Sequence, residues 1–206
     1  MILETVCVGP LEVNCYIIAE GENCPAVIID PGSEDVKIKK VLEKNKLTPG
    51  IVINTHGHYD HIGSDDKFNV PVYVHEKEVD FLRDPNLNLS GIFALPSRVK
   101  AEIIGVKDGD IIEMGKICFK VLHIPGHTPG GIALLMKSPE EDIVFTGDTL
   151  FCRGIGRSDL NGGDGVMLIK AIKQKLLSLS DKTLVYPGHG PSSTIGEEKV
   201  ENPFLN

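Results

Sequence analysis

The sequence predicts an α+β fold in which two β-sheets pack face to face and helices cover their outer surfaces. Two observations predict it: the chain has two strand-rich halves, and each half also contains segments with helical spacing. A third is the short segment 51–53, which is apolar on both faces, as a strand covered on both sides would be. With 206 residues, the chain is expected to form a single domain over residues 1–206.

The first half alternates strand and helix signals. Residues 13–19 and 26–29 are rich in β-branched residues and predict two strands, the second ending at a turn that begins with Asp30. From Ser33, the expected N-cap, apolar residues recur at helical spacing until about Asn45. The segments that follow are predicted as strands at 51–53 and 70–74, a helix at 76–83 and a long loop at 84–100.

The second half repeats the strand pattern. Four strands are predicted at residues 111–113, 117–123, 132–136 and 143–146. A long helix is expected at 165–179 and a last strand at 184–186, after which the chain is expected to end in a charged tail. Two halves of this kind favour packed sheets that are covered outside by helices.

The bulk composition excludes several classes of function. The formal net charge is −8 and there is no run of Lys and Arg, so nucleic acid is not an expected partner. No apolar run has the length of a membrane span and the amino terminus lacks the features of a signal peptide, which predicts a cytoplasmic protein without a membrane partner. The five cysteines are scattered without a CxxC pair, so neither a disulfide framework nor a cysteine metal site is expected.

The most informative segment is 55–61, which reads Thr-His-Gly-His-Tyr-Asp-His. His56 and His58 are two residues apart and project to one side of an extended chain, so both can bind one ion. Asp60 and His61 are adjacent, and a bend beyond His58 would turn them toward a second ion. Because a compact group of three histidines and an aspartate has few purely structural uses, its spacing predicts a pair of metal ions.

Three further candidate ligands lie beside glycines at the ends of predicted strands: His127, Asp148 and His189. Alone, each would more often be a structural or turn residue. Together with the first cluster they complete two sites, whose imidazole and carboxylate ligands suit two divalent ions, zinc first, with iron or manganese as alternatives. The remaining histidines, His75 and His123, are interpreted as structural.

These motifs carry a resemblance to a known family. Segments 55–61, 125–130, 147–151 and 188–190 resemble, in order, the motifs of the metallo-β-lactamase superfamily, and the match runs from about residue 2 to about residue 200. The chain looks most like the glyoxalase II group, the hydroxyacylglutathione hydrolases, particularly short members with a Gly-Arg-Ser-Asp stretch, here 156–159. The resemblance implies a four-layer αβ/βα sandwich of two mixed sheets, with the site along one edge.

The resemblance also implies which residues act. The first metal would be bound by His56, His58 and His127. The second metal would be bound by Asp60, His61 and His189. Asp148 would bridge the two metal ions. Asp60 and Asp148 are the expected catalytic residues.

Two more residues gain expected roles from the resemblance. Asp30 matches a buried aspartate that supports the metal loop, although an aspartate at a turn is an equally good interpretation. Arg157 falls where longer members place a basic residue that contacts the substrate, and it is the candidate substrate-binding residue.

The expected reaction is hydrolysis by a hydroxide that bridges the two metals, with its pKa lowered to about 7. A thioester suits this chemistry because a thiol with a pKa of about 8.5 leaves with little help from an acid. The expected partner is therefore a small molecule, an anionic thioester. Lactones and phosphodiesters are alternative substrates for the same cluster.

An alternative from another class is a persulfide dioxygenase, a related oxidoreductase. It would hold one iron through His56, His127 and Asp148, since two histidines and one carboxylate with open positions are used by non-haem iron to bind oxygen. Its Gly-Arg-Thr-Asp stretch resembles residues 156–159. A non-catalytic module that kept only the fold is disfavoured because all seven ligand positions are filled.

Overall fold

The computed structural model describes residues 1–93, 96–138 and 141–206, in which the strands form two six-stranded sheets and a short two-stranded one. The first sheet has the order β1-β2-β3-β4-β5-β6, formed by Ile2–Val8, Val13–Ala19, Pro25–Ile29, Thr48–Ile53, Val72–His75 and Ile103–Val106. The second has the order β14-β13-β10-β9-β8-β7, formed by Ser193–Thr194, Leu184–Pro187, Ile143–Gly147, Ile132–Met136, Ile117–His123 and Ile111–Met114. The small sheet pairs β11 (Leu150–Phe151) with β12 (Gly154–Ile155).

Helices link and cover these strands. The α-helices are α1 (Asp35–Lys44), α2 (Tyr59–Ile62), α3 (Val79–Arg83), α4 (Gly165–Ala171) and α5 (Ile195–Glu201). Short 3-10 helices occupy η1 (Asp65–Lys67), η2 (Glu76–Glu78) and η3 (Ser90–Phe93), and a π-helical segment, η4 (Ile172–Leu176), extends α4. None of the described helices has the length and apolar character needed to cross a bilayer.

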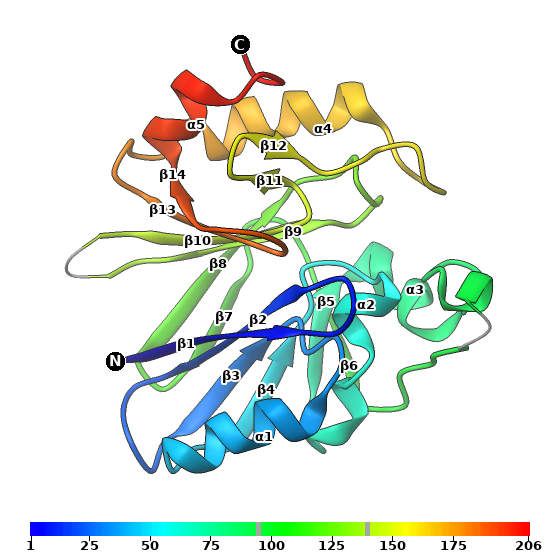
Figure 1. Ribbon diagram of the computed structural model, residues 1–206, viewed down its shortest axis with the longest axis vertical. Helices are drawn as coiled ribbons and strands as arrows, with labels where there is room; N and C mark the ends of the chain where they lie inside the picture. The colour runs from blue at the N-terminus through cyan, green and yellow to red at the C-terminus, as the bar shows by residue number, and fades with distance from the viewer. Residues whose placement is uncertain (94–95, 139–140) are drawn as a thin grey trace.

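The elements form four layers. Figure 1 shows α1 below the first sheet, α4 and α5 above the second, and the two sheets facing each other between them. Both sheets are mixed, because β3 to β6 pair in parallel beside the antiparallel β1 and β2, while β10 and β13 are a parallel pair in an otherwise antiparallel sheet. The predicted αβ/βα sandwich of two mixed sheets is therefore confirmed.

Strand β2 shows why the layers form. Successive side chains of a strand point to opposite faces, and all seven residues of β2 are buried. Cys15 and Ile17 belong to the hydrophobic cluster between the first sheet and α1. Tyr16 and Ile18 belong to the hydrophobic cluster between the two sheets. A strand that is apolar at every position except Asn14 buries both faces because one face packs against a helix and the other against the second sheet.

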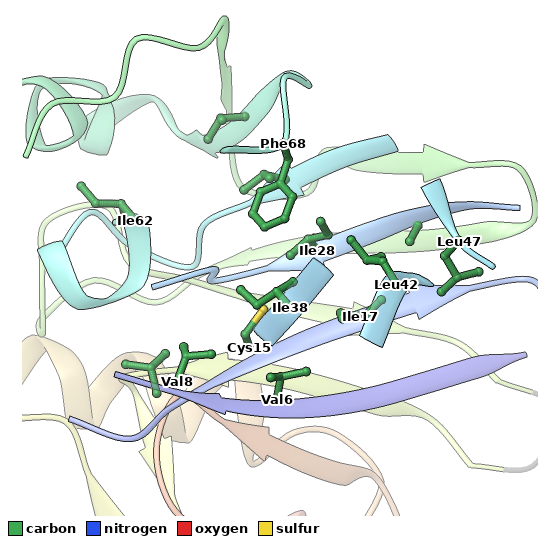
Figure 2. Close-up of a cluster of buried hydrophobic side chains, with 14 of the residues drawn as sticks. Val6, Val8, Cys15, Ile17, Ile28, Ile38, Leu42, Leu47, Ile62 and Phe68 are labelled. Atoms are coloured by element: carbon green, nitrogen blue, oxygen red, sulfur yellow. The ribbon is translucent and has the colours of Figure 1, made fainter. Parts of the chain in front are cut away.

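Helix α1 seals the outer face of the first sheet. Figure 2 shows Ile38 and Leu42 of α1 packed over Ile17 and Ile28 of the sheet. Burying side chains of this size stabilises a fold by about 1.5–3 kcal/mol each relative to leaving them in water. The helix is amphipathic for this reason, and its charged residues face solvent.

The inter-sheet layer is dominated by aliphatic side chains and a few aromatic rings. Phe119 of β8 and Phe145 of β10 are fully buried, with ring centroids 6.0 Å apart in an edge-to-face arrangement. Tyr16 of the opposite sheet lies 5.0 Å from Phe145. A third cluster joins the second sheet to α4, η4 and α5 through residues such as Leu168 and Ile172.

Three contacts couple the two sheets at the edge where the predicted site lies. The Asn14 amide donates to the Gly188 carbonyl at 2.7 Å, and the Tyr16 hydroxyl donates to the Pro187 carbonyl at 2.6 Å. The Ile132 amide donates to the Thr55 carbonyl at 2.8 Å. These bonds fix the strand ends of one sheet relative to those of the other.

The prediction that Ser33 caps the first helix is wrong. Helix α1 begins at Asp35 and its N-cap is Glu34, in a left-handed backbone conformation with φ 52° and no side-chain cap. The cause lies in Gly32, where a Cβ would fall 1.6 Å from the Asp60 carbonyl oxygen. The chain after β3 is held against the segment around Asp60, so the turn into the helix closes one residue later.

Other sequence-based boundaries need smaller corrections. The segment after His189 is not an unstructured tail, because it forms β14 and then α5, whose start has a Thr194–Glu197 capping box. The helix expected at 165–179 ends at Leu176. The loop expected at 84–100 contains η3, and its positions 94–95 lie outside the described residues.

Candidate metal centre

The predicted ligands converge because the strands before them end at one edge of the sandwich. Strand β4 leads into His56, β10 into Asp148 and β13 into His189. His127 lies in the loop between β8 and β9. The parallel pairing of β10 with β13 places their carboxyl ends together, and the contacts between the sheets bring the β4 end alongside.

Three imidazoles form the first group. His58 Nδ1 lies 3.1 Å from His56 Nε2 and 3.0 Å from His127 Nε2, and the last two nitrogens are 3.3 Å apart. All three rings are buried. Ligands that each stand about 2.0–2.1 Å from a tetrahedral zinc are separated by roughly 3.3 Å, so this triangle of nitrogens has close to the spacing of three ligands to one ion.

The second group contains Asp60, His61 and His189, whose ligand atoms lie within 4.8 Å of one another. Helix α2 begins directly after His58 and supplies the bend expected there, and the His61 ring lies beside His56 with ring centroids 4.2 Å apart, so that His56, His61 and Asp148 also form a candidate ligand group where the two groups meet. His61 Nε2 stands 3.7 Å from Asp60 Oδ2, and His189 Nε2 stands 3.6 Å from the same oxygen.

Asp148 stands between the two groups. Its Oδ2 lies 3.7 Å from His127 Nε2, while its Oδ1 lies 3.4 Å from His61 Nε2 and 3.5 Å from His189 Nε2. One carboxylate oxygen therefore faces each group. This is the arrangement of a carboxylate that can serve two ions at once.

Two atoms of this cluster test whether it fits metal ions. His61 Nε2 and Asp148 Oδ1 are buried and have no hydrogen-bond partner among the described residues. Buried polar atoms without partners are rare because each costs about 1–3 kcal/mol. Both atoms are ligand types for a divalent cation and both point into the cluster, so the donor set fits the implied metals.

The outer nitrogens of three rings are tied to oxygen atoms. His127 Nδ1 donates to the Arg157 carbonyl at 2.7 Å, and His189 Nδ1 donates to the Leu11 carbonyl at 2.8 Å. His61 Nδ1 is 3.0 Å from Asp30 Oδ2. Because Nδ1 is engaged with an oxygen atom in each of these contacts, the Nε2 atom of each ring is the one available to a metal ion in the cluster.

Asp30 makes the contacts expected of a supporting aspartate. It is 1% exposed and accepts hydrogen bonds from the Thr55 amide at 2.7 Å and the Thr55 hydroxyl at 2.6 Å, in addition to its contact with His61. It thus joins the start of the metal loop to a ring of the second group.

Glu78 is a supporting residue that sequence reasoning missed. Its carboxylate is fully buried and accepts from the Gly57 amide at 2.9 Å and the Gly130 amide at 2.6 Å. Gly57 lies between His56 and His58, and Gly130 lies in the loop that carries His127. Burial raises the pKa of Glu78. A glutamate in a short helical stretch gives no sequence signal for such a role.

The two groups differ in electrostatics in the metal-free protein. Burial lowers the pKa of His56 well below its usual value and that of His58 to about 3. Burial opposes charge on His189 as well, but the Asp148 and Asp60 carboxylates raise its pKa to about 10. The first group therefore offers neutral imidazoles, while the second holds protons that a bound cation would replace.

A family model decides the fold family. The model described as the metallo-beta-lactamase superfamily matches residues 8–189, which include the whole of the cluster. The chain belongs to the metallo-β-lactamase superfamily. Its relatives in this superfamily include proteins named as metallo-hydrolases, and the cluster of histidines and aspartates lies at the edge of its two sheets.

Two curated relatives in the superfamily match nearly full length. The Probable metallo-hydrolase YqgX of Bacillus subtilis is 40% identical over 205 residues, covering 97% of this chain and 95% of that protein. The Hydroxyacylglutathione hydrolase GloC of Haemophilus influenzae is 37% identical over 213 residues, covering 100% and 99%.

Solved structures of superfamily members agree with the fold. The BLEG-1 B3 metallo-beta-lactamase superposes with a TM-score of 0.91 at 37% identity, with full coverage of both chains. TTHA1623 in a di-iron-bound form gives a TM-score of 0.81 at 35% identity and coverage of 98% and 100%. ETHE1 from Myxococcus xanthus gives 0.80 at 30% identity and coverage of 98% and 84%.

Arg157 and the two remaining histidines of this superfamily member lie outside the ligand groups. The Arg157 side chain is 61% exposed and forms a two-point ion pair with Asp159, with bonds of 2.7 and 2.8 Å. The rings of His75 and His123 stack at 4.1 Å, and neither belongs to a described ligand group. Cys152 is likewise outside those groups.

Proposed function

We propose that this protein is a binuclear metal-dependent hydrolase of the glyoxalase II kind that cleaves thioesters. The observation that carries the proposal is the position of Asp148, which presents one carboxylate oxygen to each of two ligand groups. In the proposal, His56, His58 and His127 hold one ion, Asp60, His61 and His189 hold the other, and Asp148 bridges them.

Two divalent ions at these positions would lower the pKa of a shared water to about 7 and so supply a nucleophile at neutral pH. The protein's own contribution is to place and hold that water. Asp60 is suited to accept a hydrogen bond from it, because its carboxylate lies beside Asp148 and is held as an anion: burial opposes the charge, but His61 lowers the pKa of Asp60. Zinc suits the donor set best, and iron or manganese would also fit.

A thioester is the preferred substrate class for two reasons. The likeness to GloC over the full chain favours it, and the chemistry of the leaving group favours it as well. A thiolate needs little protonation to leave, because a free thiol has a pKa of about 8.5. Arg157 is exposed next to the His127 loop and is the proposed contact for an anionic group of the substrate. Lactones and phosphodiesters are the alternatives for the same nucleophile.

A mononuclear-iron persulfide dioxygenase is the second candidate. It is favoured by the triangle of His56, His127 and Asp148, in which His127 Nε2 lies 3.3 Å from His56 Nε2 and 3.7 Å from Asp148 Oδ2. Two histidines and one carboxylate can hold iron with positions left open for oxygen.

A variant of the second group separates the candidates. We expect two metal ions per chain by elemental analysis, together with hydrolysis of S-lactoylglutathione and no oxygen uptake on glutathione persulfide. His189→Asn should bind about one metal ion fewer per chain, and its rate of S-lactoylglutathione hydrolysis should fall roughly a hundredfold or more. His75→Asn, a buried histidine outside the ligand groups, is the matched control. One iron per chain in both the parent and His189→Asn, with oxygen uptake and no thioester cleavage, would establish the dioxygenase.

A further inference from the structure

A cavity of about 550 Å³ lies beside the candidate metal centre, and we call it the Asp60 cavity. Its walls include apolar residues on the β1–β2 hairpin and a facing segment: Val8, Pro10, Leu11, Val13, Tyr59 and Pro96. Small-molecule sites typically have volumes of roughly 300–1,000 Å³ and mostly apolar walls with a few polar groups. The Asp60 cavity has the size and the character of such a site.

Two residues connect this cavity to the second ligand group. Asp60, a member of that group, lines the cavity directly. Leu11 also lines it, and the Leu11 carbonyl accepts the hydrogen bond from His189 Nδ1 at 2.8 Å. A molecule bound in the cavity would therefore lie next to Asp60 and against Leu11, whose carbonyl holds His189, on the side of the second ligand group.

The charges around the cluster differ from side to side. Among the described residues that line the Asp60 cavity there is no lysine or arginine, and Asp60 is the single carboxylate. An anionic group placed there would lose its water without gaining a cationic side chain as a partner, and it would face the Asp60 carboxylate. Arg157 belongs to the first group's surroundings instead. Its backbone carbonyl accepts a hydrogen bond from His127, and its guanidinium group is exposed to solvent.

The rim of the cavity is apolar as well. Leu11 is 48% exposed, and Phe93, which is 54% exposed, packs at a tilt against Tyr59 with ring centroids 4.9 Å apart. Ile92, beside Phe93 in η3, is 73% exposed. The β1–β2 hairpin and η3 thus each present exposed apolar side chains, Leu11 in the wall of the cavity and Phe93 against the wall residue Tyr59, and exposed apolar surface of this kind can mark a place of binding.

We propose that the Asp60 cavity binds the acyl group of the substrate and selects an uncharged, apolar acyl chain longer than a lactoyl group. The anionic thiol half of the thioester lies toward Arg157. This inference rests on the proposed thioester hydrolysis and adds to it the chemical class of the acyl group.

The first test compares acyl groups on one thiol. With the metal-loaded protein, kcat/KM is measured for S-acetyl-, S-butyryl-, S-hexanoyl- and S-succinylglutathione. We expect kcat/KM to rise about fourfold for each added methylene, as hydrophobic transfer predicts, and the anionic succinyl compound to fall roughly tenfold or more below the butyryl compound.

A positive charge at the opening of the cavity should abolish the preference for longer apolar acyl groups. Leu11→Lys keeps the backbone carbonyl that holds His189 but places a cation at the opening, so the rise with chain length should flatten and the succinyl compound should gain relative to the butyryl compound. Val200→Lys introduces the same charge at an exposed apolar position of α5, 75% exposed, and should retain the parent profile. Equal kcat/KM for all acyl groups in the parent protein would overturn the inference.

A second measurement does not depend on hydrolysis. 2-Octanone, an uncharged ketone that cannot be hydrolysed, is titrated into the metal-loaded protein while the methyl signals of Val8, Leu11 and Val13 are followed by NMR. We expect these signals to shift and that of Val200 to stay. If octanone shifts them but no thioester is cleaved, the hydrolase proposal fails while the apolar ligand class stands. If thioesters are cleaved without chain-length preference and no signal shifts, the cavity proposal fails alone.

Discussion

At the scale of single residues, the candidate metal centre depends on residues that are not ligands themselves but contact the ligands and fix their orientation. Asp30 is the clearest case, since it bonds Thr55 and His61 from a buried position. Gly188 is another, because a Cβ there would lie 2.3 Å from Asp148 Oδ1. Neither residue needs to touch a substrate to determine whether the cluster can hold two ions.

Asp30→Asn should weaken metal binding at the second group. The amide is nearly the same size, but it cannot accept hydrogen bonds at both of its head atoms, so Thr55 and His61 lose part of their support. We expect the dissociation constant of the weaker-bound metal to rise about 10–100-fold, measured by competition with a chromophoric chelator. Asp181→Asn, at an exposed aspartate, is the control. Unchanged affinity in Asp30→Asn would mean that Asp30 acts only in the turn.

Metal binding should release protons. In the metal-free protein the carboxylates of Asp148 and Asp60 raise the pKa of His189 to about 10, so this ring is protonated at neutral pH and must lose its proton to bind a cation. Affinity at the second group should therefore increase with pH, up to about tenfold per unit for each displaced proton. Calorimetry at pH 7.5 in buffers of different ionisation enthalpy measures the release. His189→Asn should release fewer protons, and equal heats in all buffers would contradict the prediction.

At the scale of elements, short segments that connect strands align the ligand loops. Helix α2 turns the chain directly after His58 and so divides one motif between two groups. The segment η2 carries Glu78, which accepts from the loops of both His58 and His127 through Gly57 and Gly130. The precision of the first group therefore depends on an element that contributes no ligand.

Glu78→Gln should disturb the first group. The glutamine side chain presents one oxygen and one N–H₂ group to two backbone donors, so one donor is left without a partner at a cost of about 1–3 kcal/mol in the free energy of unfolding. We expect that loss in urea denaturation and a weaker metal at the first group in chelator competition. Glu76→Gln, an exposed neighbour that pairs with Lys107, should change neither. A variant with lower stability but parent-like metal affinity would show that Glu78 has a structural role only.

At the scale of the whole molecule, the cluster joins the two halves of the sandwich. His56, His58, Asp60 and His61 follow the first sheet, whereas His127, Asp148 and His189 follow strands of the second. Direct contacts between the sheets at this edge include the Tyr16 hydroxyl bond to Pro187. Ions held by ligands from both sheets would add further cross-links at the same edge.

Removing metal should therefore lower the stability of the entire fold. Binding to the native state alone stabilises it by RT ln(1 + [L]/Kd), which is about 4 kcal/mol when free metal is a thousand times Kd. We expect the melting temperature in scanning calorimetry to fall on chelation and to recover when zinc is added back, with a smaller fall for His189→Asn. A melting temperature that is the same with and without the chelator would argue against metal binding by ligands from both sheets.

The sequence by itself predicted most of the long strands and the candidate ligands. Segments such as 13–19 and 132–136 are apolar at nearly every position, and this predicts buried strands without knowledge of their partners. The two-residue spacing of His56 and His58 likewise predicts that both face one ion, and a bend beyond His58 is predicted to turn Asp60 and His61 toward a second, because side-chain direction is a local property of the chain. These predictions depend only on neighbours in the sequence.

Only the tertiary structure decided the rest. The strands β1 and β6, the left-handed start of α1 at Glu34, the helix α5 and the role of Glu78 all arise from contacts between distant segments. Glu78 illustrates the reason: its sequence context is that of an exposed helical residue, and its burial follows from two loops that close over it. The Asp60 cavity is formed in the same way, by the β1–β2 hairpin and by segments around Tyr59 and Pro96 that are distant from it in the sequence.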